Sequence, residues 1–233
     1  MKSYENFIQK LPGNTFGVPN KSAYSTHKVW SPAHEINCQH HVINIPVNYC
    51  SKAVLTTTYT DPDHAKLRVL AKLLTSKYLH PEIREKQGAY GSGARLNPDG
   101  AFTFFSYRDP RNVQTLDVFD ASNNWLQNEL KQITDQDVLE AKLAVFQDVD
   151  APIPPCNKGM REFLMGLTPE VLQRFRAEVI TVSPGDLMKV SEKYLMKATS
   201  NSLSKVILGP KGDKLNVNSR NGELWTVIEM ETV

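Results

Sequence analysis

The chain has 233 residues, of which 40% are hydrophobic and 22% charged, and its formal net charge is +2. This length is enough to bury a sizeable core and suits one domain with extensions. The small charge, without a stripe of Lys and Arg, argues against a nucleic-acid-binding protein. No apolar run approaches the roughly 20 residues that a membrane-spanning helix needs. We therefore expect neither nucleic acid nor a membrane among its partners.

The cysteines are three in number and widely spaced, at Cys38, Cys50 and Cys156. With no Cys-x-x-Cys pair, they suit a reducing compartment and argue against both a disulfide framework and a thiolate zinc site. Residues 1–10 have neither the apolar core of a secretory signal nor the arginines of a transit peptide. If the natural protein has a targeting segment, we expect it outside this sequence.

The first part of the chain predicts a linker followed by two strands. Residues 1–29 are rich in Pro, Gly, Asn and Ser, which is typical of a linker or of the tail of a preceding domain. The β-branched runs at 42–47 and 53–59 predict strands. Because Pro46 cannot donate a hydrogen bond to a neighbouring strand, the first strand should lie at an edge or contain a bulge.

A helix is expected next, and then a hairpin. Asp61-Pro62 places an N-cap before a proline at the first helical position. The turn signal Asn-Pro-Asp-Gly at 97–100 predicts the hairpin. The helix should bury a stripe of residues at helical spacing, namely Leu67, Leu70, Leu74 and Tyr78.

The second half of the chain is mainly helical in pattern. Residues 134–137 resemble a capping box that starts a helix. That helix must end before Asp150 to Pro155, because this segment contains three prolines. This order of elements indicates an α+β domain with helices on one face of a mainly antiparallel sheet. Helices are expected at 113–130 and 134–149, from Thr168, and from Ser183 to about 197, with strands at 206–208 and, more weakly, near Trp225.

The most distinctive segment, residues 80–93, presents an arginine and a tyrosine on either side of Gly88. Three glycines within six residues allow a sharp turn. The guanidinium of Arg84 and the phenol of Tyr90 are hydrogen-bond donors that can hold a carbonyl or carboxylate oxygen. The alternative is structural: Arg84 complements the dipole at the end of its helix, and Tyr90 fills a strand position.

Two motifs around this segment carry a resemblance. Arg-Glu-Lys-x-Gly-Ala-Tyr-Gly at 84–91, followed by Phe-x-x-x-Ser-Tyr-Arg-Asp-Pro at 102–110, resembles the C-terminal repeat of the pitrilysin/insulin-degrading family of zinc metallopeptidases. The similarity covers roughly residues 30 to 210, with Gln87 where the family usually has glycine. It implies a family repeat at 30–212, with 1–29 as the linker and 213–233 as a C-terminal tail.

The zinc site of such a peptidase is missing from the sequence. A family zinc site needs His-x-x-Glu-His, with two histidine ligands and a glutamate base, and the chain has no such motif. The nearest match, His34 to Cys38, has cysteine where a His-Glu-x-x-His motif needs its second histidine. We expect this segment and the pair His40–His41 to be ordinary surface or strand residues. By resemblance, zinc belongs to the complete enzyme and is bound by a domain that this chain lacks.

The resemblance also implies a function and a set of site residues. The chain would be the non-zinc-binding part of a metalloendopeptidase that degrades peptides in an enclosed chamber in the mitochondrial matrix. Its partners would be peptide substrates and the N-terminal, zinc-binding half. Arg84 and Tyr90 would be the catalytic residues, and the same two with Gly88 and Ala89 would bind substrate.

Some alternatives stay open from the sequence. Tyr107 and Arg108 either line the chamber wall or end a structural hairpin. The chain alone should be inactive, as it lacks the zinc ligands. A stand-alone non-catalytic subunit or peptide-binding module of the same family is the alternative function, and a truncated product without a function of its own is a third.

Overall fold

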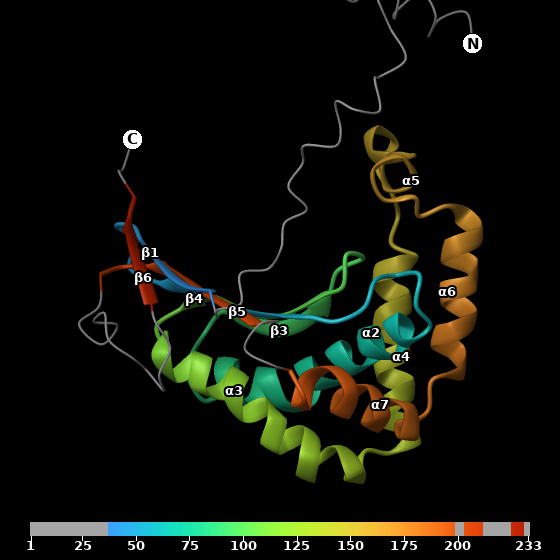
Figure 1. The fold of residues 1–233 in the computed structure, drawn as a ribbon, viewed down its shortest axis with the longest axis horizontal. Helices are drawn as coiled ribbons and strands as arrows, with labels where there is room; N and C mark the ends of the chain where they lie inside the picture. The colour runs from blue at the N-terminus through green and yellow to red at the C-terminus, as the bar shows by residue number, and fades with distance from the viewer. Residues whose placement is uncertain (1–36, 199–202, 212–224, 231–233) are drawn as a thin grey trace, which may run out of the picture. The chain divides into compact units, whose positions relative to one another are not determined.

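A computed structural model describes residues 37–198, 203–211 and 225–230 (Figure 1). The predicted linker at 1–29 and residues 34–36 lie outside the described residues. The described strands form a six-stranded sheet in the order β3-β4-β2-β5-β1-β6. Their bounds are Asn37–Val42 for β1, Asn48–Leu55 for β2, Gly91–Leu96 for β3, Ala101–Asp109 for β4, Leu203–Gly209 for β5 and Trp225–Glu229 for β6.

The sheet is mixed in direction. β2 pairs antiparallel with β4 and β5, and β3 pairs antiparallel with β4, whereas β1 is parallel to both of its neighbours, β5 and β6. The predicted α+β class is confirmed, as are the hairpin turn at 97–100 and the weak strand near Trp225. β5 lies between β2 and β1, antiparallel to the first and parallel to the second.

The first two strands lie earlier in the sequence than predicted. β1 ends at Val42, where a strand was expected to begin, and the amide of Ile43 makes the last hydrogen bond to Gly209 before the chain turns. Pro46 therefore lies in the connection rather than in an edge strand. β2 ends at Leu55, and the β-branched residues after it leave the sheet, where Thr56 donates through its amide and hydroxyl to the carbonyl of Gly100.

The helices follow the predicted order with one addition. Thr134 and Asp137 form the capping box at the start of the helix Asp135–Val149, as predicted. The predicted N-cap is off by one residue, because Pro62 and not Asp61 is the N-cap of the first helix. The Asp61 carboxylate still accepts the amide of Asp63 at 2.7 Å. The helix α5 was not predicted. The bounds are Asp63–Leu74 for α2, Val113–Asn128 for α3, Asp135–Val149 for α4, Met160–Met165 for α5, Pro169–Thr181 for α6 and Pro184–Val190 for α7; π-helical turns extend α2 over Thr75–Glu85 and α7 over Ser191–Met196.

The core lies between the sheet and the helices α2, α3 and α7, which cover one face of it (Figure 1). Phe102 and Phe104 of β4 point into this core and are at most 2% exposed. Of the predicted stripe, Leu67, Leu70 and Leu74 are fully buried in α2, whereas Tyr78 lies in the π-helical segment and is only partly buried. The hairpin β3–β4 is thereby fixed against α2, and the turn that joins them lies at one edge of the sheet.

Two buried lysines share the carboxylate of Asp120, which is itself 34% exposed. Lys52 and Lys205, neighbours across β2 and β5, are 5% and 2% exposed and contact Asp120 at 3.1 and 2.8 Å. Replacing Asp120 with Asn is expected to lower the free energy of unfolding by about 2 kcal/mol, because two buried ammonium groups lose a charged partner. Urea unfolding would measure this.

A surface pair gives the matched control for this substitution. Asp150 pairs with Arg176 at 2.6 Å in a more exposed setting, so Asp150→Asn should cost less than about 1 kcal/mol. If the two variants lose the same stability, the buried lysines do not depend on Asp120.

Candidate functional site

The predicted site begins where the first helix ends. Pro81 lies inside the π-helical turn and has no amide hydrogen to continue an α-helix. The amide of Lys86 donates to the carbonyl of Pro81 at 3.1 Å, five residues back, which is the wider π-type spacing. Arg84 lies in the last turn of this π-helical segment.

A glycine turn then reverses the chain. Gly88 has a φ of 82°, in the left-handed region that favours glycine. Two nested hydrogen bonds close the turn: Gly88 donates to the carbonyl of Arg84 at 3.1 Å, and Ala89 to that of Ile83 at 3.2 Å. Together they form a helix end like the Schellman motif, except that each hydrogen bond spans one residue more, as expected after a π-helix. The turn leads directly from the helix into β3.

The turn leaves both predicted donors at the surface. Tyr90 is 63% exposed, and Arg84 is also exposed. Among the residues that the structure describes, none forms a hydrogen bond or ion pair with the Arg84 guanidinium. The side chain of Ala89 is buried, and the amides of Gly88 and Ala89 are used within the turn. A substrate role for Gly88 and Ala89 stays a prediction. Any contact with the substrate would be made by their carbonyl oxygens.

Two side chains at the end of β4, Tyr107 and Arg108, contact the Tyr90 ring. The ring of Tyr107 meets the Tyr90 ring edge-on, with centroids 5.4 Å apart and an interplanar angle of 66°. The Cζ atom of Arg108 lies 5.7 Å from the centre of the Tyr90 ring. Sequence reasoning pointed to Tyr107 and Arg108 without linking them to Tyr90. A contact across two strands depends on their register, which the sequence does not show.

The described part of the candidate histidine segment, from Asn37 onward, lies in a strand. Cys38 and His40 lie in β1 and are 1% and 2% exposed. Burial lowers the pKa of His40, so this histidine is neutral near pH 7. His41 bonds through Nε2 to Gln39. In the part of the chain that the structure describes, no three His, Cys, Asp or Glu side chains are grouped to hold a metal ion.

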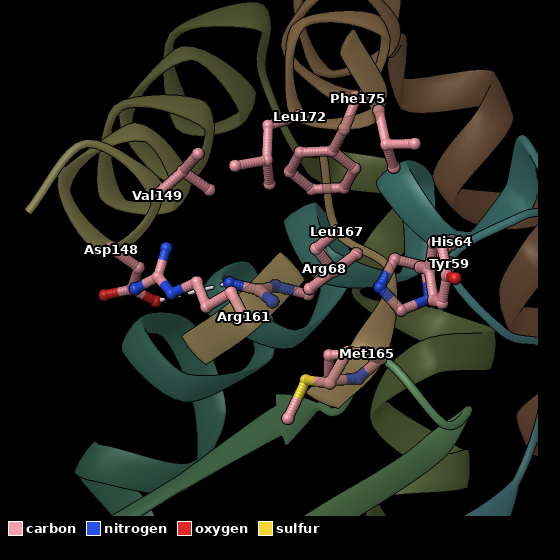
Figure 2. A pocket seen from close by; sticks show the side chains of 12 residues that line it. Tyr59, His64, Arg68, Asp148, Val149, Arg161, Met165, Leu167, Leu172 and Phe175 are labelled. Carbon is pink, nitrogen blue, oxygen red and sulfur yellow. Dashed lines mark ion pairs between the residues drawn. The ribbon is translucent and has the colours of Figure 1, made fainter. Parts of the chain in front are cut away.

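A separate pocket lies between the helices (Figure 2). Its volume is about 250 Å³, and neither Arg84 nor Tyr90 lines it. Figure 2 shows apolar side chains on one side and the ion pair of Arg68 with Asp148, at 3.7 Å, on another. The lining side chains come from α2, α4, α5, α6 and nearby loops, and include Tyr59, His64, Arg68, Asp148, Arg161, Met165, Leu172 and Phe175.

The histidine of this pocket should make the fold sensitive to acid. Burial lowers the pKa of His64 to about 4, although its hydrogen bond to the carbonyl of Thr57 opposes the shift. The unfolded chain, with a histidine pKa near 6.5, takes up a proton at a pH where the folded chain does not. The stabilisation is therefore complete above pH 6.5 and is lost as the pH falls toward 4.

We expect this loss to reach at most about 3 kcal/mol of unfolding free energy. The variant His64→Gln should show a flatter dependence of stability on pH across the same range, measured by urea unfolding. If the variant keeps the wild-type dependence of stability on pH, His64 does not cause the loss of stability in acid.

Comparison with known proteins matches these features to one family. The profile of the PreP C-terminal domain matches residues 39–209, which include the whole of the Gly88 turn and both strands of the hairpin. "Presequence protease, mitochondrial" of Drosophila melanogaster is 42% identical over 219 residues, covering 94% of this chain and 20% of that protein. The mouse protein of the same name is 47% identical over 177 residues, or 76% of this chain and 17% of its own length.

The yeast protein is similar to the same extent. "Presequence protease, mitochondrial" of Saccharomyces cerevisiae is 38% identical over 208 residues, covering 88% of this chain and 20% of that protein. The chain thus spans about a fifth of the length of the curated relatives that it matches.

Solved structures share the fold at low sequence identity. Pitrilysin superposes with a TM-score of 0.57 at 15% identity, covering 84% of this chain and 22% of that one. A protease from Helicobacter pylori gives a TM-score of 0.59 at 16% identity, over 77% of this chain and 45% of that one. With the family profile covering most of the chain, the resemblance of the motifs at 84–91 and 102–110 is confirmed. The chain belongs to the PreP C-terminal domain family, the C-terminal domain of presequence protease.

Proposed function

We propose that this chain is the C-terminal, non-zinc-binding part of a longer presequence-peptidase-like metallopeptidase that degrades peptides in an enclosed chamber. The observation that carries the proposal is the family match over 39–209, which contains the turn with Arg84 and Tyr90. That turn exposes two donors at the edge of the sheet. In this proposal its partners are peptide substrates and the N-terminal half of the enzyme. Its proposed location is the mitochondrial matrix, and the relatives are named as mitochondrial.

In this proposal Arg84 and Tyr90 act on the peptide backbone. When a peptide bond is hydrolysed, negative charge develops on the carbonyl oxygen, and fixed donors aimed at that oxygen stabilise the transition state. The phenol of Tyr90 supplies one donor without a net charge. The guanidinium of Arg84 supplies several donors in a planar fork and can hold a backbone carbonyl before the reaction as well as during it.

Zinc is assigned to another part of the longer protein. A zinc site of a peptidase needs three protein ligands, usually His and Glu, and the described residues bring no such group together. The described residues do not fit the metal, and in the proposal their role is confined to binding and orienting the peptide.

The exposed apolar surface of α5 supports a larger assembly. Phe163 and Leu164 are 86% and 62% exposed, and Met160 and Met165 of the same short helix are 45% and 46% exposed. Neighbouring apolar side chains at a surface are typical of protein–protein contacts. We propose that the remaining part of the longer protein covers them, because the relatives are about five times as long as this chain.

The size of the natural protein tests the proposal against its alternative. An antibody against this chain should detect a polypeptide as long as the curated relatives, and that polypeptide should cleave peptides in a chelator-sensitive manner. A natural product of only 233 residues that binds peptides without cleaving them would instead establish the stand-alone peptide-binding module.

The domain division is a proposal that truncation tests. We propose that residues 1–29 are a linker, so a chain without them should keep its cooperative thermal unfolding, as measured by circular dichroism. Loss of the cooperative transition would place these residues in the folded domain of residues 30–212. The segment 213–233 contains β6, which pairs with β1, and its removal would expose that strand.

A further inference from the structure

Three contacts link Tyr90 to two consecutive residues of β4. The rings of Tyr107 and Tyr90 pack edge to face, and the guanidinium of Arg108 lies over the Tyr90 ring. The amide of Tyr90 also donates to the carbonyl of Arg108 at 3.3 Å. Edge-to-face ring pairs and a cation over a ring are both favourable and directional. Tyr90 is largely exposed, so these contacts restrict a side chain that water alone would leave free to rotate.

A β-bulge produces this arrangement. Opposite the single residue Tyr49 of β2, β4 has two residues, Tyr107 and Arg108, because Asn48 pairs with Asp109 and Cys50 with Ser106. Arg108 has a φ of 48°, a left-handed conformation that no other non-glycine residue in the described ranges adopts. Residues with a Cβ adopt it at a cost in free energy, and bulges next to functional sites redirect side chains.

The residue after the bulge fixes the strained conformation. Asp109 is fully buried, and its carboxylate accepts the amide of Arg111 and the hydroxyl of Thr115, each at 2.8 Å. The side-chain amide of Asn48 donates to the carbonyl of Asp109 at 3.1 Å. The end of β4 therefore has little freedom to relax Arg108 into an ordinary strand conformation.

Gly91 makes room for the contact between the Tyr107 and Tyr90 rings. Gly91 pairs with Tyr107 across the hairpin, and a Cβ on Gly91 would lie 2.2 Å from Cε1 of the Tyr107 ring. Because Gly91 has no side chain, the Tyr107 ring can lie across the backbone next to Tyr90. The glycine after Tyr90 in the motif thus has a packing function.

We infer that Arg108 and Tyr107 are positioning residues that hold the phenol of Tyr90 in its working orientation. The inference rests on the proposed function of Tyr90 as a donor to the peptide carbonyl. A donor contributes most when its direction is set before the reaction, since no reorientation is then needed as charge develops. Arg108 and Tyr107 set that direction through the ring of Tyr90 and need not touch the peptide.

The test is steady-state kinetics of the complete enzyme on a long peptide. Arg108→Asn removes the cation but suits the left-handed conformation, which asparagine tolerates. We expect kcat to fall about tenfold with little change in KM or melting temperature. Arg108→Lys, which keeps a cation over the ring, should recover most of the lost activity.

The second position allows the same comparison. Tyr107→Phe keeps the aromatic ring and should stay close to wild type, whereas Tyr107→Leu should lose kcat as Arg108→Asn does. Arg95 supplies the matched control, because its Cζ lies 5.5 Å from the ring centre of Phe105 on the same hairpin. Arg95→Gln removes an equivalent cation and should leave the kinetics unchanged.

A double-mutant cycle separates positioning from direct contact with the substrate. If Arg108 acts through Tyr90, adding Arg108→Asn to Tyr90→Phe should cause no further loss. Additive losses, or a rise in KM alone, would place Arg108 on the peptide and overturn the inference. Wild-type kcat in Arg108→Asn beside an impaired Tyr90→Phe would overturn it while leaving the proposed function intact. An unimpaired Tyr90→Phe would overturn the role of Tyr90 itself, and the inference with it.

Discussion

Replacing Tyr90 with phenylalanine in the complete enzyme is expected to lower kcat by about ten- to a thousandfold and to leave KM nearly unchanged. The substitution removes one hydroxyl and almost no volume. The Tyr90 ring keeps its contacts with Tyr107 and Arg108, because both of them involve the ring rather than the hydroxyl. The loss falls on kcat because the hydrogen bond to the carbonyl oxygen strengthens only as charge develops on that oxygen.

The melting temperature and the zinc content of this variant give its controls. Both should equal those of the wild-type enzyme, since Tyr90 is exposed and contributes no metal ligand. Wild-type kcat on a long peptide, with the fold and the zinc intact, would show that Tyr90 has only a structural role.

Arg84 is expected to respond differently, because a guanidinium that holds the peptide backbone acts before the reaction as well as during it. Arg84→Lys keeps the positive charge but loses the planar fork of donors. We expect KM to rise about tenfold, the equivalent of one charge-assisted hydrogen bond, with a smaller fall in kcat. Arg84 is exposed and has no ion pair among the described residues, so the fold should not change.

A neighbouring cation on the same helical turn controls for charge alone. Lys86 pairs with Glu82 at 2.6 Å and is 65% exposed, so Lys86→Gln should leave KM close to wild type. If Lys86→Gln raises KM as much as Arg84→Lys does, the effect is one of general charge, and Arg84 does not grip the peptide.

The features that the sequence predicts well are those fixed by local pattern. The stripe of α2 depends on helical spacing, and the capping box at Thr134 depends on residues three apart, so both are visible in the sequence and confirmed. The glycine turn is equally local. Gly88 adopts the positive φ that its place after the helix suggests, and Arg84 and Tyr90 lie on either side of the turn at the surface.

Features fixed by distant partners were missed or misplaced. The position of β1 is set by its pairing with β5 and β6, which lie more than 160 residues further along the chain. The β-branched run that begins at Val42, on which the prediction rested, lies almost entirely after β1. The bulge at Arg108 depends on the register between β2 and β4. α5 is six residues long between Gly159 and Gly166, both with positive φ, and carries apolar side chains that stay exposed, so it has no buried stripe to reveal it.

The central claim, that this chain serves a peptidase without binding its zinc, is tested most directly by metal analysis combined with a peptide-cleavage assay. The 233-residue chain alone and the longer protein that contains it would be purified under the same conditions. We predict stoichiometric zinc and peptide cleavage for the longer protein only, because the described residues of this chain bring no ligand set together. Stoichiometric zinc on the isolated chain, together with chelator-sensitive cleavage, would contradict the account.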